Sequence, residues 1–333
     1  MLTCLLQPPF IYDPFQAFTH RASLDGSWLA WDFVSQYPVV DPASDVCLVF
    51  INAFSTEGGD RPAPSDAYSD NLVNGIANQC SNTMVIIHNA GIRIVDGFYS
   101  HPNVTAIIYA HLPGQFTGPA LTTLMYGEQS FSGRMPYTTA KNASDYGNLL
   151  YPTRPDNTSN YYTQSNFTEG VYIDYRAFDA QNISARFPFG FGLTYTTFNY
   201  SSLTAGLVDP AANLSSLPAD APIESGGNPR LFDNIATVTA VVSNMGNAVA
   251  AEVAQLYIGI PNAPVKQLRG FSKDTINPGH STTVSFLLTR RDLSVWDVVA
   301  QQWRLQTGTY KVYVGKSVED IQLTGSIEIR TSG

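Results

Sequence analysis

The first half of the chain alternates short apolar runs with amphipathic segments. Three runs rich in β-branched residues, at 47–51, 84–88 and 104–110, are typical of strands covered on both faces. Apolar residues at three- and four-residue steps predict helices over residues 66–79 and 119–126, the second with Pro at its first position. This order predicts a mostly parallel α/β sheet with right-handed crossovers.

Other parts of this region are less regular. Residues 1–44 fit neither the helical nor the strand period, whereas residues 94–99 fit a short helix. Helical periodicity disappears over residues 140–200. Residues 201–232 are rich in Ala, Pro, Ser and Gly, which is typical of a linker or an extended surface loop.

The last hundred residues alternate with period two. Four segments have the spacing of strands in a β-sandwich: residues 236–244, 253–260, 282–288 and 309–315. No acid–base pair or metal-binding cluster stands out among them, which favours a supporting role. We therefore expect an α/β sandwich domain over 1–200, a linker over 201–232 and a separate β-sandwich domain over 233–333.

Composition narrows the classes of protein. The 333 residues suffice for two domains, and the net charge of -9 argues against nucleic acids and anionic membranes as partners. No run approaches the length of a membrane span, and the first apolar residues are too few for a signal peptide. We therefore expect the natural N-terminus to lie upstream of Met1.

The chain also carries seven Asn-x-Ser/Thr sequons without Pro in the middle position. Their number favours passage through a glycosylating secretory pathway and makes N-glycans expected partners. The alternative is a chance excess in a chain rich in Asn, Ser and Thr. The sequons begin at Asn103, Asn142, Asn157, Asn166, Asn182, Asn199 and Asn213.

The three cysteines, Cys4, Cys47 and Cys80, match no metal-binding spacing. Cys47 falls in a predicted buried strand, where an inert apolar thiol is expected. Cys80 can pair with Cys47 or with a cysteine outside the chain. The sequence leaves that choice open.

A polar loop follows each predicted parallel strand, at residues 55–58, 88–91 and 111–115. The carboxyl ends of parallel strands share one edge of a sheet, which is where such sheets bind ligands. Glu57 lies just past the first strand and can serve as a general acid if apolar walls raise its pKa. The alternative is a solvated loop glutamate beside Arg61.

Other side chains are weaker candidates for this edge. His88 and His111 can line it, or their ring nitrogens can be satisfied by loop backbone. Trp28 and Trp31 are expected to be core or interface anchors, with sugar stacking as the alternative.

From about residue 45 to the end, a series of motifs follows in a fixed order: FIN (50–52), EG (57–58), HPNVTAI (101–107), LPGQ (112–115), SGRMP (132–136), FTEGVYIDYR (167–176), FPFGFGLTY (187–195), EVAQLY (252–257), LRGF (268–271) and RDLSVW (291–296). In this order they resemble the C-terminal half of glycoside hydrolase family 3, especially its secreted fungal β-glucosidases. The resemblance implies an α/β sandwich domain, with its first strand missing, followed by a fibronectin type III-like β-sandwich.

The same resemblance implies a function. Glu57 matches the family's catalytic acid/base in the retaining hydrolysis of terminal non-reducing β-D-glucosyl residues, as in the breakdown of cello-oligosaccharides. The expected substrate is thus a β-glucoside or an oligosaccharide, and no metal or organic cofactor is implied. Two positions depart from the family pattern: Phe116 replaces a common Glu, and His111 replaces a small residue.

The resemblance also shows what this sequence does not contain. The family's nucleophile is an aspartate on an N-terminal (β/α)8 barrel, and no residue here matches its motif. We therefore expect this barrel as a missing partner domain and little or no glycosidase activity from the isolated chain. The alternatives are a non-catalytic fragment and a carbohydrate-binding or interaction protein derived from such an enzyme.

Overall fold

The computed structural model describes residues 9–57, 59, 61–150 and 163–332. The chain divides into two compact units: the first comprises Met1–Gln129 and Thr139–Tyr151, and the second comprises Ser130–Thr138 and Pro152–Gly333. Most of the described segment after residue 129 thus clusters with the β-rich unit, and the domain boundary expected at residue 200 stays a prediction.

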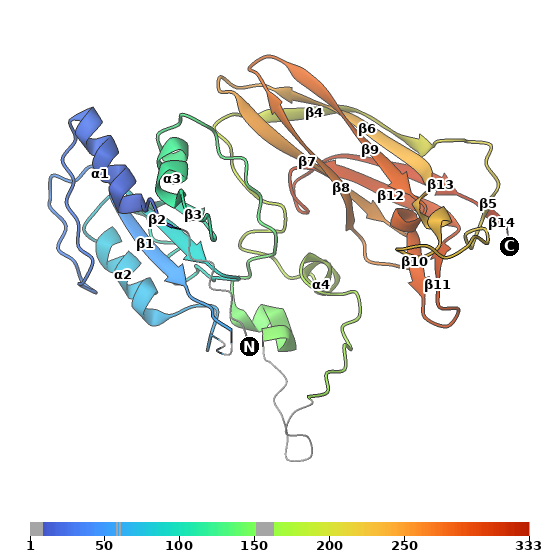
Figure 1. Cartoon of the computed structure of the whole chain (residues 1–333), viewed down its shortest axis with the longest axis horizontal. Helices are drawn as coiled ribbons and strands as arrows, with labels where there is room; N and C mark the ends of the chain where they lie inside the picture. The colour runs from blue at the N-terminus through green and yellow to red at the C-terminus, as the bar shows by residue number, and fades with distance from the viewer. Residues whose placement is uncertain (1–8, 58, 60, 151–162, 333) are drawn as a thin grey trace. The chain divides into compact units, whose positions relative to one another are not determined.

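The first unit is built on a three-stranded parallel sheet (Figure 1). Its strands are β1 (Cys47–Ala53), β2 (Thr83–Asn89) and β3 (Val104–Tyr109), in the order β1-β2-β3. Val49 lies opposite Val85, so the β-branched residues of neighbouring strands are in register. The three predicted strands and their parallel pairing are confirmed.

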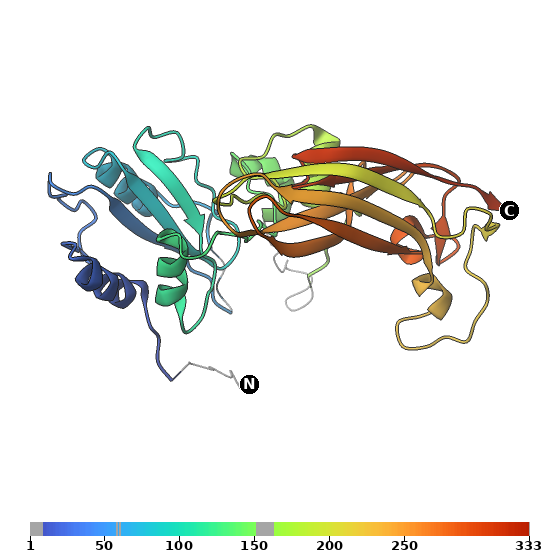
Figure 2. The ribbon, with the colours of Figure 1, turned by 90° about the horizontal axis from the view of Figure 1, so that it is seen from above.

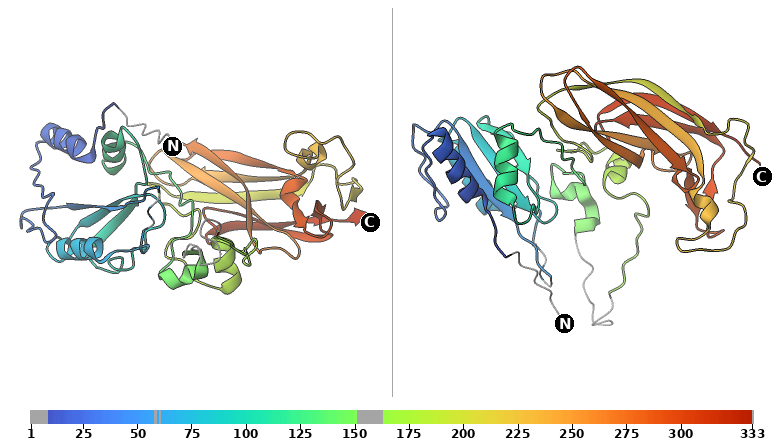
Figure 3. Two further views of the ribbon diagram at one scale, coloured as in Figure 1. Left: turned by 60° about the horizontal axis from the view of Figure 1, so that its bottom comes forward. Right: turned by 45° about the horizontal axis from the view of Figure 1, so that its top comes forward.

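Helices cover both faces of this sheet. Figure 3 shows α2 (Ala67–Ala77) on one face and α1 (Pro14–Asp25) with α3 (Thr117–Met125) on the other. The helix α2 begins where Asp66 accepts a hydrogen bond from Ser69 N, as is typical of an N-cap. The unit also contains a 3-10 segment over Ala143–Leu150.

The core between α1, α3 and the sheet is small. Phe18, Ile86 and Leu121 form its buried centre. The helix α1 was not predicted, because only three of its residues are buried and they are mostly small. Pro119 is the third residue of α3 rather than its first. The short helix predicted over residues 94–99 is wrong, since this segment is irregular and then a turn.

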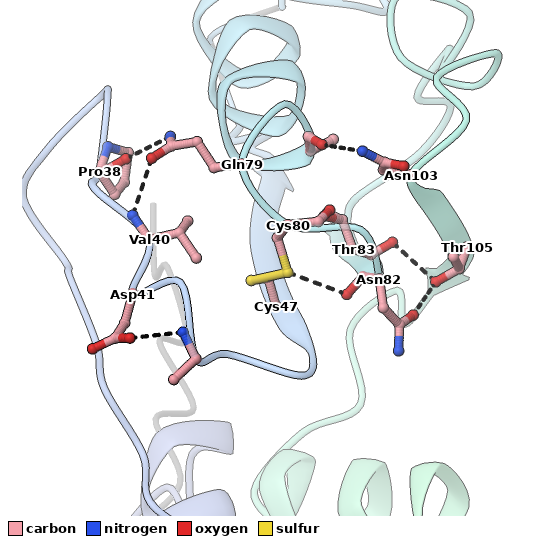
Figure 4. Close-up of a disulfide and its surroundings, with 12 residues drawn as sticks. Pro38, Val40, Asp41, Cys47, Gln79, Cys80, Asn82, Thr83, Asn103 and Thr105 are labelled. Carbon is pink, nitrogen blue, oxygen red and sulfur yellow. Dashed lines mark hydrogen bonds between the residues drawn. A yellow bond between two sulfur atoms is a disulfide. The ribbon is translucent and has the colours of Figure 1, made fainter.

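A disulfide joins Cys47 at the start of β1 to Cys80 after α2 (Figure 4). The inert thiol expected at Cys47 is therefore wrong. A buried strand does not exclude a disulfide when the partner lies beside the strand end, and here the two Cα atoms are 6.3 Å apart. Cys4 lies outside the described residues.

Replacing both Cys47 and Cys80 by Ala is expected to destabilise the first unit by about 3–4 kcal/mol, because the crosslink restricts the unfolded chain. Hydrogen exchange should show the amides of β1 and β2 losing protection by about 10²- to 10³-fold. Amides of β12 in the second unit serve as the control and should not change. Unchanged protection in β1 and β2 would contradict a stabilising role.

The second unit is an antiparallel β-sandwich (Figures 1 and 2). One sheet has the order β4-β6-β9, with bounds Phe198–Leu207, Asn234–Asn244 and Ser281–Thr289. The other has the order β13-β12-β7-β8, with bounds Ile321–Ile329, Gly308–Gly315, Ala250–Gly259 and Gln267–Ile276. The inward residues of both sheets share one core, in which Leu256 and Val312 are fully buried.

Shorter elements complete the second unit: α4 (Tyr175–Gln181), β5 (Leu214–Ser215), β10 (Ser294–Asp297), β11 (Gln302–Leu305), β14 (Thr331–Ser332) and two 3-10 turns, Pro229–Phe232 and Arg291–Leu293. The four predicted sandwich strands are confirmed as β6, β7, β9 and β12. The expected linker over 201–232 begins too early, because β4 extends to Leu207 and pairs with β6.

A buried polar group ties the SGRMP segment to the sandwich. Arg134 Nη2 lies 2.7 Å from Glu252 Oε2, and these side chains are 9% and 3% exposed. Tyr200 donates a 2.8 Å hydrogen bond to the other oxygen of the carboxylate. Burial and the adjacent carboxylate raise the pKa of the Tyr200 hydroxyl, which therefore stays protonated as a donor.

Candidate functional site

The loop over residues 54–66 connects the carboxyl end of β1 to α2. Its first and last parts are held by the segment that follows β2. Ala90 N donates to Ala53 O at 3.1 Å, and Ile94 N donates to Pro64 O at 2.9 Å. The loop is therefore fixed at both ends at the ligand-binding edge expected for a parallel sheet.

Glu57 lies in a tight turn of this loop. Gly59 N donates to Thr56 O at 3.3 Å, so the chain reverses tightly around Glu57, whose side chain is exposed. Arg61 Nη1 donates to Ile92 O at 2.8 Å and thus helps to hold the loop against the segment after β2. The position of Glu57 beyond the strand end agrees with the sequence prediction, whereas its catalytic role stays a prediction.

Residues of this loop line a pocket of about 550 Å³. Its lining includes Asn52 at the end of β1, Asp66 and Tyr68 at the start of α2, and the side chains of Arg61 and Arg93. Thr56 and Gly59, which flank the turn at Glu57, line the pocket as well, but Glu57 is not among its described lining residues. Glu57 therefore lies at the edge of the pocket.

Arg93 is a buried charged residue that lines this pocket. It is 1% exposed, and its Nη2 lies 2.6 Å from Asp70 Oδ1 and 3.5 Å from Asp66 Oδ2. Its Nη1 also donates to Ile94 O. Gly97 permits this arrangement, because a Cβ there would clash with the Asp70 carboxylate. The ion pairs join the start of α2 to the segment after β2.

Sequence reasoning missed Arg93. A usable signal was present, since Arg93 is the one charged residue in the apolar run 92–95. A charge in such a run is buried with a partner more often than it is free. The partners, Asp66 and Asp70, lie more than twenty residues earlier, so only the fold identifies them.

The two histidines do not line the described pocket. His88 belongs to β2, where its Nε2 lies 3.2 Å from Thr117 Oγ1 and its ring stacks on Phe50. His111 is half-buried at a φ of 52° beside Tyr109. Burial lowers the pKa of both histidines, which favours their neutral forms.

Phe116, one of the two departures from the family pattern, lies on the surface, as do the tryptophans. Phe116 is exposed and packs edge-to-face on Phe10. Trp28 and Trp31 are 67% and 61% exposed, so a role as core anchors is wrong. Trp31 packs on Phe15 within an exposed aromatic group. Interface and sugar-stacking roles for the tryptophans remain open.

Across residues 9–57, 59, 61–150 and 163–332, no three His, Cys, Asp or Glu side chains gather as a metal ion would need. In the same part of the chain, no helix is both long and apolar enough to cross a bilayer.

Comparison with protein families matches residues 4–195 to the "Glycosyl hydrolase family 3 C-terminal domain". Residues 252–318 match the "Fibronectin type III-like domain". These matches follow the order of the parallel α/β unit and the antiparallel β-sandwich.

Individual relatives of this chain bear β-glucosidase names. The chain is 57% identical to "Probable beta-glucosidase M" of Emericella nidulans, over 96% of this chain and 41% of that protein. It is 52% identical to "Beta-glucosidase cel3A" of Pyricularia oryzae, over 97% of this chain and 41% of that protein. The chain thus spans well under half the length of these curated relatives.

Among solved structures, the beta-D-glucoside glucohydrolase of Trichoderma reesei superposes with a TM-score of 0.87 at 36% identity, covering 97% of this chain and 46% of that one. A beta-glucosidase of Chaetomella raphigera gives a TM-score of 0.85 at 40% identity, with 97% and 45% coverage. The chain belongs to glycoside hydrolase family 3, and it carries the family's C-terminal domain together with a fibronectin type III-like domain.

Proposed function

We propose that this chain is the C-terminal part of a secreted β-glucosidase that removes terminal non-reducing β-D-glucosyl residues from cello-oligosaccharides. The observation that carries this proposal is the exposure of Glu57 on an anchored loop at the carboxyl end of a parallel strand. The β-glucosidase names of relatives matched over nearly the whole chain support the substrate class.

In this proposal Glu57 is the acid/base of a retaining hydrolysis. It gives its proton to the departing glycosidic oxygen while a second carboxylate attacks the anomeric carbon. Glu57 then takes a proton from water, which attacks the anomeric carbon and releases glucose from the second carboxylate. The two carboxyl groups of such enzymes lie about 5–5.5 Å apart.

The nucleophile and most of the sugar site are proposed to come from a further domain, the family's barrel. The described neighbours of Glu57, from Phe54 to Thr56, are exposed like Glu57 itself, so this chain alone does not surround the carboxyl with apolar walls. The exposed Trp28 and Trp31 also suit contact with additional protein. The relatives are long enough to supply such a domain.

Secretion is part of the proposal. The disulfide between Cys47 and Cys80 suits an oxidising compartment, where disulfides persist. The sequons suit the same route. Two independent features of the chain therefore support an extracellular glycoprotein.

The test compares two proteins on 4-nitrophenyl β-D-glucopyranoside. One is the 333-residue chain, and the other, called the fused enzyme, joins it to the N-terminal part of the Emericella nidulans relative. We expect nitrophenol release from the fused enzyme and little or none from the chain alone. Appreciable release by the purified chain, with contaminating glucosidase excluded, would contradict the need for a second domain.

A carbohydrate-binding role without catalysis is the second candidate, favoured by the exposure of Trp28 and Trp31. Aromatic faces of this kind can stack on sugars. Isothermal titration of the chain with glucose, cellobiose and xylobiose tests it. Absence of binding to all three sugars counts against this candidate and leaves the enzymatic proposal standing.

A further inference from the structure

We propose that in the secreted, folded protein N-glycans occupy Asn142, Asn166, Asn182, Asn199 and Asn213, whereas Asn103 carries none although it lies in an equally valid sequon. This inference rests on the proposed secretory route. The sequons differ in the environment that the folded chain gives to each asparagine: half-buried with its amide nitrogen hydrogen-bonded, or exposed at the surface. Asn157 lies outside the described residues.

The atom that N-glycosylation modifies is the side-chain amide nitrogen of asparagine, Nδ2. In N-glycosylation, Asn Nδ2 forms a bond to the anomeric carbon of a polyprenyl-diphosphate-linked oligosaccharide. Nδ2 loses one proton, the bond from the anomeric carbon to the diphosphate oxygen breaks, and the polyprenyl diphosphate leaves. The product is a bulky hydrophilic group on Nδ2, which a folded chain accommodates only where Nδ2 faces solvent.

Asn103 directs its polar groups into the protein (Figure 4). Its Nδ2 donates a 2.8 Å hydrogen bond to Ala77 O at the end of α2. Its backbone N donates to His101 Nδ1 at 3.2 Å, and its backbone O accepts from Thr83 N at 2.8 Å. The half-buried side chain thus connects α2 to the start of β3, and a glycan on Nδ2 would occupy that junction.

The hydroxyl of Thr105, in the same sequon, is also hydrogen-bonded within the protein. Thr105 Oγ1 donates to Asn82 Oδ1 at 2.5 Å and lies 3.4 Å from Thr83 O (Figure 4). Oligosaccharide transfer occurs on the unfolded chain, so this bonding does not itself prevent the reaction. A glycan on Nδ2 would have to fit into the half-buried junction between α2 and β3, however, so we expect a chain modified at Asn103 to misfold and to be retained. Secreted molecules are therefore expected to lack a glycan there.

The five other described sequons place their asparagines at the surface. Asn199 shows the pattern most clearly, because Phe198 and Tyr200 on either side point into the sandwich core while Asn199 points outward from β4. Asn182 ends α4 in the left-handed conformation, with φ 54° and ψ 42°, and is exposed. The remaining three asparagines are exposed and lie outside helix interiors: Asn142, Asn166 and Asn213.

The experiment is glycopeptide mapping by mass spectrometry. The full chain is secreted from a yeast host behind a cleavable leader peptide, and peptides spanning each sequon are analysed before and after enzymatic release of N-glycans. We expect a glycan on each of the five exposed asparagines and an unmodified peptide at Asn103. As a matched pair, Asn199→Gln should increase gel mobility by one glycan, whereas Asn103→Gln should not.

The outcomes are distinct. A glycan on Asn103 in the folded, secreted protein would overturn the role given to the junction between α2 and β3. A secreted chain with no glycan at an exposed asparagine would overturn the assignment at that asparagine. Mapping does not measure catalysis, so inactivity of the fused enzyme leaves this inference intact, and an unglycosylated chain leaves the catalytic proposal intact.

Discussion

Replacement of Glu57 by Gln in the fused enzyme is expected to lower kcat for cellobiose by about 10²- to 10⁴-fold, the usual contribution of a positioned general acid/base. Glutamine has nearly the same shape but cannot transfer a proton. The loop that carries it is held by Arg61 and by backbone hydrogen bonds rather than by the Glu57 side chain, so its conformation should persist. Initial rates of glucose release measure the effect.

The matched control is Glu328→Gln on β13. Glu328 is exposed in the β-sandwich, so this change should leave kcat within about twofold, since surface substitutions away from special features have small effects. If Glu57→Gln keeps more than about a tenth of the parent rate, the proton is supplied by another group.

Glu252→Ala is expected to destabilise the second unit by about 3–5 kcal/mol, the typical cost of removing one partner of a buried ion pair. The change leaves the buried Arg134 guanidinium without its carboxylate and Tyr200 without its acceptor. Hydrogen exchange of β7 and β6 amides should report the loss of protection.

Two variants make this prediction specific. Glu252→Gln keeps an acceptor for Tyr200 but removes the negative charge, so we expect an intermediate loss. Glu328→Ala makes a comparable truncation at an exposed strand position and should change stability by about 0.5 kcal/mol or less. Equal protection in Glu252→Ala and Glu328→Ala would contradict the importance of the buried pair.

The elements that local patterns predicted are those with strong periodicity. The strand at 47–51 and the helix capped by Asp66 were found because each has a single buried face or a continuous apolar run. The helix α1 was missed because only Ala17, Phe18 and Ala22 are buried along it. Residues 94–99 were misread as a helix because Ile94, Val95 and Phe98 are buried by tertiary contacts rather than along one helical face.

The candidate site was likewise predictable from the sequence only in part. Glu57 could be placed from the sequence, because the end of a parallel strand determines where the following loop lies. The ion pairs of Arg93 and the pairing of Cys47 with Cys80 depend on which segments the crossover through α2 brings together. The linker was placed too early because β4 alternates only weakly, with several half-buried residues toward its end.

The most direct measurement uses Glu57→Ala in the fused enzyme with 2,4-dinitrophenyl β-D-glucopyranoside, whose leaving group needs no proton. The glycosyl-enzyme should form and then accumulate, because no base remains to activate water. Azide needs no such base, so added azide should accelerate dinitrophenolate release and give β-glucosyl azide. An unchanged rate with azide and no azide product would show that the carboxyl of residue 57 does not transfer the proton.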